Sequence, residues 1–289
     1  MKLLRVGAVG EERPALVDAD GTLRDLSGVV PDISAALLAE DGGLARVRAA
    51  ADGGGLPVLA AGDADAEVRI GAPLTGIGKV VCIGLNYHDH AAETGAEPPA
   101  EPVIFFKAAD TVVGPNDTVL VPRGSKKTDW EVELAIVIGR TARYLPSHEE
   151  ALAHIAGYAV SNDVSEREFQ IERGGTWDKG KNCETFNPLG PWFVTADEVP
   201  DPQALALRTW VNGALKQDGS TADQIFPVAE IVRYVSQYMT LYPGDVINTG
   251  TPAGVAMGQP EPKPYLRAGD VVELEIGGLG RQRQVFGQA

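Results

Sequence analysis

The feature that most constrains the fold is a series of short apolar runs that begins at Lys79, each bounded by glycine, proline, asparagine or aspartate. The runs are KVVCIGLN, PVIFFKA, TVLVP, VELAIVIG, AGYAVSND, LRTWVNG, DVINTGT and DVVELEI. Runs of this length between turn residues are typical of β-strands. The 34 glycines and 20 prolines among 289 residues supply turns for many short strands and leave little room for long helices. We therefore predict a mixed α/β fold in which strands predominate.

The beginning of the chain has a different pattern and predicts a small N-terminal domain that contains β-strands. Short alternating segments come first, with Asp20-Gly21 as a hairpin-type turn dipeptide. Two helical patterns follow, broken at Gly42-Gly43 and ended at Gly53, and then a turn-rich stretch, GDADAEVRIGAPLTG. We place the N-terminal domain at residues 1–72 and a larger domain at residues 73–289.

The clearest helix is predicted over PVAEIVRYVSQYM, residues 227–239. Its apolar residues recur at the three-to-four spacing of one buried face, with a proline at the first turn. These residues are Val228, Ile231, Val232, Val235 and Met239. Most other elements of the larger domain are expected to be strands.

Charge and composition exclude several classes of partner. Lys and Arg number 25 against 40 for Asp and Glu, so the net charge is −15 and a nucleic-acid partner is not expected. No apolar stretch approaches the roughly 18 residues that span a membrane, and Glu11 interrupts the start before a signal-peptide core could form. Two cysteines, Cys82 and Cys183, are too few for a disulfide scaffold. We expect a cytoplasmic protein with no membrane or nucleic-acid partner.

The segment TDWEVELAIVIGR places two carboxylates on one face of a strand. Alternation puts Glu131 and Glu133 on one face, while Val132, Leu134 and Ile136 point to the other. Two glutamates at this spacing can converge on a hard cation. An edge strand with two solvated glutamates explains the same pattern equally well.

A third carboxylate, Asp163, ends the apolar run of GYAVSNDVSEREFQIERGG. A capping box over Ser165–Glu168 predicts a short helix after it, on which Arg167 follows Asp163, and Gln170 follows Arg167, at about one-turn spacing. The alternative is that Asp163 only caps this helix. If Asp163 joins Glu131 and Glu133, the set offers oxygen ligands alone, which favours magnesium, manganese or calcium over zinc.

Other candidates lie in three loops. In GLNYHDHAAETG, Glu93 can orient His90 as a base, although an exposed loop histidine fits as well. In GGTWDKGKNCETFNPLGPW, Lys181 lies in a glycine-rich stretch, with Lys179 as a rival. Thr251 lies in a tight Gly/Pro loop, VINTGTPAGV, that suits a carboxylate and is equally compatible with a plain turn.

The order of these segments resembles the fumarylacetoacetate hydrolase family over roughly residues 79–285. Its motifs appear in sequence as GLNYHDHAAE, FFK, DWEVELAIVIG, NDVSEREFQ, WDKGKNCETFNPLGPW, VNG and PGDVINTGTPAGV. The resemblance implies a β-roll catalytic domain, a homodimer, a divalent metal (Mg²⁺ first, with Mn²⁺ or Ca²⁺ as alternatives) and an oxo-acid substrate. Trp130 is a departure, because tyrosine is common there in the family.

The resemblance also implies roles for individual residues. The metal carboxylates fall on Glu131, Glu133 and Asp163. The catalytic positions fall on His90, Glu93 and Lys181, and the substrate-binding positions on Arg167, Gln170 and Thr251. Residues 87–101 would form a lid, and residues 122–127 and 173–178 would contact the substrate tail.

The activity implied is hydrolysis of a carbon–carbon bond in 2,4-dioxo acids of the acylpyruvate type, with release of pyruvate. The segments SKKTDWEVEL and ERGGTWDKGK are similar to a bacterial subgroup labelled either ureidoglycolate lyase or hydrolase of 2,4-diketo-3-deoxy sugar acids. Ureidoglycolate lyase, oxaloacetate decarboxylase and oxo-acid tautomerase activities therefore stay as alternatives on the same site.

Overall fold

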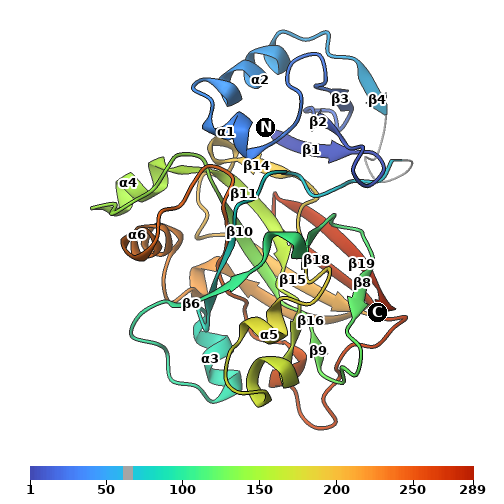
Figure 1. Ribbon diagram of the computed structural model, residues 1–289, viewed down its shortest axis with the longest axis vertical. Helices are drawn as coiled ribbons and strands as arrows, with labels where there is room; N and C mark the ends of the chain where they lie inside the picture. Colours follow the sequence, from blue (N-terminus) through green and yellow to red (C-terminus); the bar gives the residue numbers. More distant parts are fainter. Residues whose placement is uncertain (61–67) are drawn as a thin grey trace.

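Two β-sheets build most of the molecule in the computed structural model, which describes residues 1–60 and 68–289 (Figure 1). Among these residues, the large sheet has ten strands in the order β4-β3-β2-β1-β14-β11-β10-β17-β5-β6. The second sheet has five strands in the order β16-β15-β18-β19-β8. The structure is therefore the mixed, strand-dominated α/β fold that the sequence predicts.

The strands of the large sheet are β1 (Lys2–Val6), β2 (Arg13–Val17), β3 (Leu23–Asp25), β4 (Val58–Ala60), β5 (Val80–Gly84), β6 (Val103–Lys107), β10 (Val132–Ile138), β11 (Ile155–Asn162), β14 (Phe193–Thr195) and β17 (Val246–Asn248). Those of the second sheet are β8 (Val119–Val121), β15 (Ala206–Val211), β16 (Ala214–Ser220), β18 (Val271–Ile276) and β19 (Gly280–Gln288). Two short pairs complete the strands, β7 (Val112–Val113) with β13 (Asn187–Pro188) and β9 (Thr128–Asp129) with β12 (Ser165–Glu166).

The α-helices are α1 (Ala35–Ala39), α2 (Gly43–Asp52), α3 (His88–Thr94), α4 (His148–Ala153), α5 (Asp178–Lys181) and α6 (Val228–Tyr238). The shorter turns are η1 (Ala109–Thr111), η2 (Glu168–Glu172, a π-helix), η3 (Ala196–Glu198), η4 (Thr221–Asp223) and η5 (Ala256–Gly258). In the described part of the chain, none of the helices has the length and hydrophobicity that crossing a membrane requires.

Strand β10 lies inside the large sheet between β11 and β17, and all seven of its residues are buried. The edge-strand alternative for the glutamate segment is therefore wrong. Val132, Leu134 and Ile136 pack into the main core between the two sheets. Ala135 and Val137 belong to separate clusters on the other face. The alternation expected from the sequence is observed, and apolar burial on both faces holds β10 in place.

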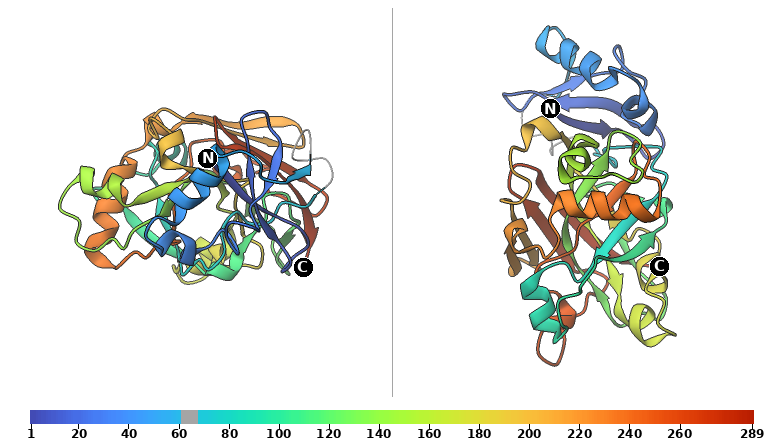
Figure 2. Two further views of the ribbon diagram at one scale, coloured as in Figure 1. Left: turned by 90° about the horizontal axis from the view of Figure 1, so that it is seen from above. Right: turned by 90° about the vertical axis from the view of Figure 1, so that its left-hand side faces the viewer.

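The N-terminal strands extend the large sheet, because β1 pairs with β14 in antiparallel register, Lys2 opposite Val194. The Asp20-Gly21 turn lies between β2 and β3, and α1 and α2 are separated at Gly42-Gly43, as predicted. These two helices lie at the end of the molecule opposite α3 and α5 (Figures 1 and 2). Part of the predicted turn-rich stretch lies outside the described residues.

Helix α6 buries Val228, Ile231, Val232 and Val235 against the main core, as its periodicity predicts. Two details differ at its ends. The proline at position 227 precedes the first helical residue, and the helix stops before Met239, which packs against the core from an extended conformation.

The helix predicted from a capping box at Ser165–Glu168 does not form there. Ser165 lies in β12 and donates its hydroxyl to the carbonyl of Asp163 at 2.9 Å. The helical turn η2 begins at Glu168 instead, and the amide of Phe169 donates to Oε2 of Glu166 at 2.7 Å. Pairing of β12 with β9 holds Ser165 in an extended conformation, so Glu166 replaces it as the acceptor at the start of the turn.

Candidate active site

Three carboxylates meet at one end of the β10–β11 pair. Glu131 immediately precedes β10, Glu133 is its second residue, and Asp163 immediately follows β11. The register places Val132 opposite Asn162, and the amide of Asp163 donates to the carbonyl of Glu131 at 3.0 Å. One oxygen from each of the three carboxylates lies within 4.8 Å of the others, and all three residues are buried. The antiparallel pairing thus joins side chains about thirty residues apart.

Two buried lysines contact this trio. Lys181, the last residue of α5, donates from Nζ to Oε2 of Glu131 at 2.8 Å and to Oδ2 of Asp163 at 3.0 Å. Lys107, the last residue of β6, donates to Oδ1 of Asp163 and to the carbonyl of Val164. Lys179, the rival of Lys181 in the sequence, donates to the exposed carbonyl of Arg173. Of Lys179 and Lys181, the sequence pattern thus favours the one that reaches the trio, but it does not indicate Lys107, although the FFK motif ends on this residue.

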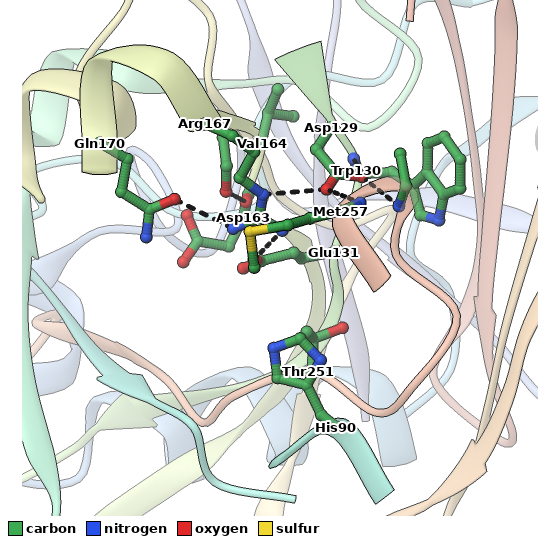
Figure 3. A network of polar contacts seen from close by, with 12 residues as sticks. His90, Asp129, Trp130, Glu131, Asp163, Val164, Arg167, Gln170, Thr251 and Met257 are labelled. Carbon is green, nitrogen blue, oxygen red and sulfur yellow. Dashed lines mark hydrogen bonds and ion pairs between the residues drawn. The ribbon is translucent and has the colours of Figure 1, made fainter. Parts of the chain in front are cut away.

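Arg167 connects the trio to a fourth carboxylate (Figure 3). Its guanidinium lies 2.7 Å from Oε1 of Glu131 and 2.9 Å from Oδ2 of Asp129, and it donates to Oε1 of Gln170 at 3.0 Å. Asp129 also accepts hydrogen bonds from the amides of Ala256 and Met257. Sequence patterns indicate Arg167 and Gln170 as site residues but not Asp129. The DWEVEL motif includes Asp129, but nothing in the motif shows that it meets Arg167.

The charges around the two glutamates shift their pKa values in opposite directions. Burial by itself raises the pKa of Glu131, but Lys181 and Arg167 outweigh burial and hold it well below its usual range. Burial, followed by the charges of Asp163 and Glu131, raises the pKa of Glu133 well above its usual range. In the described residues, no cation lies within ion-pairing distance of Glu133, and the amide of Gly250 donates to its Oε2 at 2.7 Å.

The helix α3 carries the predicted histidine–glutamate pair. Nδ1 of His90 lies 2.7 Å from Oε1 of Glu93, and Oε2 of Glu93 accepts the amide of Gly254 at 2.9 Å. Asp89 accepts the amide of Ala253 at 3.1 Å, so two carboxylates of α3 hold the helix against the loop after β17. His90 is buried, which removes the exposed-loop interpretation of this residue.

Thr251 is buried in the same loop, but its hydroxyl is already engaged. It donates to the carbonyl of Val132 at 2.9 Å and accepts from Nε2 of Gln217 at 2.8 Å. The sequence could not indicate this, because Gln217 lies 34 residues away on β16. The hydroxyl of Thr251 therefore ties the loop to β10 in this structure.

A cavity of about 190 Å³ brings the predicted residues together. Its polar lining consists of His90, Thr94, Glu131, Glu133, Arg167, Gln170, Lys181 and Thr251. Glu93 and Asp163 do not line the cavity, but they contact two residues that do, His90 and Lys181. The cavity thus joins a possible base, a lysine and a carboxylate cluster around one space.

The carboxylate trio fits a hard divalent cation. All of its donors are oxygens, the preference of magnesium, manganese and calcium. Glu133 is a buried carboxylate without a cationic partner among the described residues, so a bound ion would supply the missing positive charge. Carboxylate oxygens have more lone pairs than the lysine and arginine contacts use. Glu131, Glu133 and Asp163 are therefore the residues that would hold the ion.

Residues 79–286 match the protein family described as "Fumarylacetoacetate (FAA) hydrolase C-terminal". A protein of Burkholderia multivorans is 53% identical over 285 residues, which are 99% of this chain and 98% of the relative. Its name says only that it is thought to be a hydrolase.

Solved structures of three similar proteins cover this whole chain. Fumarylacetoacetate hydrolase from Exiguobacterium antarcticum is 37% identical with a TM-score of 0.84, and 100% of it is covered. A 2-hydroxyhepta-2,4-diene-1,7-dioate isomerase from Mycobacterium marinum is 34% identical with a TM-score of 0.75, and 98% of it is covered. Maleylpyruvate hydrolase from Sphingobium sp. SYK-6, in complex with manganese(II) and pyruvate, is 28% identical with a TM-score of 0.80, and 100% of it is covered.

Proposed function

Because the chain belongs to the fumarylacetoacetate hydrolase family, we propose that it is a metal-dependent hydrolase that cleaves a carbon–carbon bond of 2,4-dioxo acids and releases pyruvate. The observation that carries this proposal is the cavity lined by Glu131, Glu133 and His90, with Asp163 and Glu93 bound to lining residues. The manganese and pyruvate in the maleylpyruvate hydrolase structure support the same assignment.

The reaction adds water across the bond between C3 and C4. The hydroxyl goes to C4, which leaves as a carboxylic acid, and C3 takes a proton to become the methyl group of pyruvate. A divalent cation held by Glu131, Glu133 and Asp163 would act as a Lewis acid toward the 2-oxo acid end of the substrate.

His90 is suited to remove the proton from water. Its Nδ1 is bound to Glu93, which fixes the orientation of the ring and leaves Nε2 for a water molecule. Lys181 is suited to carry positive charge beside the reacting atoms. Burial alone would lower its pKa, but Asp163 and Glu131 outweigh burial and raise it, so the ammonium stays protonated at neutral pH. It can stabilise negative charge that develops on the substrate or return a proton to C3.

The first experiment measures pyruvate release from a panel of 2,4-dioxo acids with magnesium, manganese or calcium and again with a chelator. We expect pyruvate that disappears with the chelator and returns when metal is added back. Turnover that is indifferent to chelation would contradict metal dependence.

The His90→Ala variant tests the water-activating role. We expect it to retain metal binding, measured by calorimetry, while kcat falls roughly 10²- to 10⁴-fold, the usual contribution of a general base. His148→Ala is the matched control, because His148 is exposed on α4 and is not among the residues lining the cavity. A His90→Ala variant with full activity would remove His90 from the mechanism.

The isomerase among the similar structures supports a second candidate, tautomerisation of an oxo acid at the same site. Tautomerisation and oxaloacetate decarboxylation need no attacking water. If the 2,4-dioxo acids release no pyruvate, proton exchange at C3 would favour the tautomerase, and loss of CO₂ from oxaloacetate would favour the decarboxylase. Release of urea from ureidoglycolate would favour the lyase instead.

A further inference from the structure

We infer that the acyl group removed by this enzyme is short, uncharged and apolar, and that it binds against the apolar part of the cavity wall. This inference rests on the proposed function and names the substrate class within it. It selects simple acylpyruvates over 2,4-dioxo acids that end in a second carboxylate or carry several hydroxyls.

The first argument is the composition of the cavity wall. Beside the polar side chains, the cavity is lined by Leu85, Phe105, Ile171, Trp177 and Met257. Contact with these aliphatic and aromatic groups favours a tail whose apolar surface leaves water on binding.

The wall is also fixed in position. The rings of Phe105 and Trp177 meet edge to face with their centroids 5.4 Å apart. Gly84 packs directly against Trp177, since a Cβ atom at this position would come within 2.5 Å of the indole. An aromatic wall held from two sides offers a preformed apolar surface.

The second argument is the position of the positive charges. Apart from His90, the basic residues in the described lining of the cavity are Arg167 and Lys181. Arg167 already contacts Asp129 and Glu131, and Lys181 contacts Glu131 and Asp163. These cations belong to the metal end, where the 2-oxo acid would bind. A second carboxylate against the apolar wall would face no cation of the described lining that is free of another partner, which is unfavourable.

A polyhydroxylated tail would also find few free hydrogen-bond donors on this wall. The hydroxyl of Thr94, which also lines the cavity, already donates to the carbonyl of His90 at 2.9 Å. Substrate hydroxyls would lose water without gaining equivalent hydrogen bonds. The cavity volume of about 190 Å³ is also below the roughly 300–1,000 Å³ of typical ligand sites, which favours a short acyl group.

The test compares 2,4-dioxoheptanoate with 2,4-dioxoheptanedioate, which have the same carbon chain and differ only in a terminal methyl or carboxylate. A 5,6-dihydroxy-2,4-dioxo acid is the third substrate. We expect kcat/KM for pyruvate release to be at least tenfold higher for the monocarboxylate than for either of the others. A preference for the dicarboxylate or the dihydroxy acid would overturn this inference while leaving the hydrolase intact. Release of pyruvate from none of the three would instead overturn the proposed function, and this inference with it.

The Ile171→Arg variant tests the apolar wall directly. The side chain of Ile171 is 49% exposed, so the change adds a cation where one can be solvated without distorting the core. We expect the ratio of kcat/KM for dicarboxylate over monocarboxylate to rise at least tenfold. Ile171→Gln controls for polarity without charge, and Leu152→Arg, on α4 and 45% exposed, controls for net charge. An unchanged ratio in Ile171→Arg would place the tail elsewhere and overturn the inference.

Discussion

Two networks of buried and half-buried charges in this molecule follow different rules. The N-terminal network joins Arg5, Glu12, Asp32, Arg69 and Asp117. Each of its carboxylates contacts an arginine, for example Glu12 and Arg69 at 2.8 Å. The site network consists of Lys107, Asp129, Glu131, Glu133, Asp163, Arg167 and Lys181.

The difference lies in one side chain. In the site network, Glu133 is 2% exposed, and no cation in the described part of the chain lies within ion-pairing distance of it. A buried charge without a partner lowers the stability of the folded state, whereas a paired and hydrogen-bonded one does not. In the N-terminal network every carboxylate contacts an arginine, whereas the site network leaves Glu133 without a cation among the described residues, which supports the proposal that a bound metal ion completes it.

The largest expected effect comes from Glu133→Gln. Losing contacts around a metal ligand already weakens binding roughly 10- to 100-fold, so losing a ligand should cost about 100-fold or more in metal affinity, with activity falling in parallel. In the presence of a chelator, the same variant should unfold at a higher temperature than the wild type, because an unpartnered buried carboxylate has been removed. Calorimetric metal titration and thermal unfolding measure both. A lower melting temperature of the variant without metal would show that Glu133 stabilises the metal-free protein, contrary to the difference drawn between the two networks.

The second prediction concerns Lys107, whose side chain is completely buried against Asp163. Removing one partner of a buried ion pair typically costs roughly 3–5 kcal/mol in the free energy of unfolding. We expect Lys107→Met to lose about this much in urea denaturation with a chelator present, and added metal to recover part of the loss. Lys179→Met, at an exposed lysine on the same helix as Lys181, is the control and should change little. Equal stability of the two variants would contradict the assignment.

The fold and much of the site could be predicted from local patterns. Alternation along one strand placed Glu131 and Glu133 on a common face, and the apolar run before Asp163 placed it at a strand end. The structure brings all three together because β10 and β11 pair in antiparallel register. The same alternation could not distinguish a central strand from an edge strand, because the position of a strand in a sheet depends on distant segments.

Long-range pairing also explains what was missed. Lys107 and Asp163 are 56 residues apart, and Asp129 and Arg167 are 38 apart. Neither contact has a signature within a single segment. The hydroxyl of Thr251 is engaged by residues of two other strands, which a loop motif cannot reveal. The homodimer implied by the family resemblance stays a prediction, which a measurement of the molecular mass in solution would test.

A third, smaller effect is expected from Glu12→Gln in the N-terminal network. Burial raises the pKa of Glu12, but the hydrogen bond from Arg69 and the charge of Arg5 outweigh it, so the pKa lies below its ordinary value of 4.5. Charge-assisted hydrogen bonds contribute roughly 1.5–3 kcal/mol, so we expect a loss near the lower end of this range at pH 7.

The sign of the pH dependence follows from this lowered pKa. The stabilisation is complete above the pKa of unfolded glutamate and is lost as the pH falls through the lower pKa of the folded state. The difference in unfolding free energy between wild type and Glu12→Gln should therefore shrink below about pH 4.5. A difference that persists unchanged at acid pH would show that packing, not charge, is responsible.

The smallest effect should come from Arg208→Ala, which removes an exposed ion pair that lies outside both networks. Arg208 and Asp218 face each other across β15 and β16 at 2.9 Å, but their side chains are 46% and 54% exposed. Water and salt screen such a pair, and fixing the two side chains in one geometry offsets most of its attraction. We expect no resolvable change in melting temperature at either low or high salt. A clear, salt-sensitive fall in melting temperature would show that an exposed ion pair stabilises this protein without burial. Burial would then not explain why the two charge networks differ.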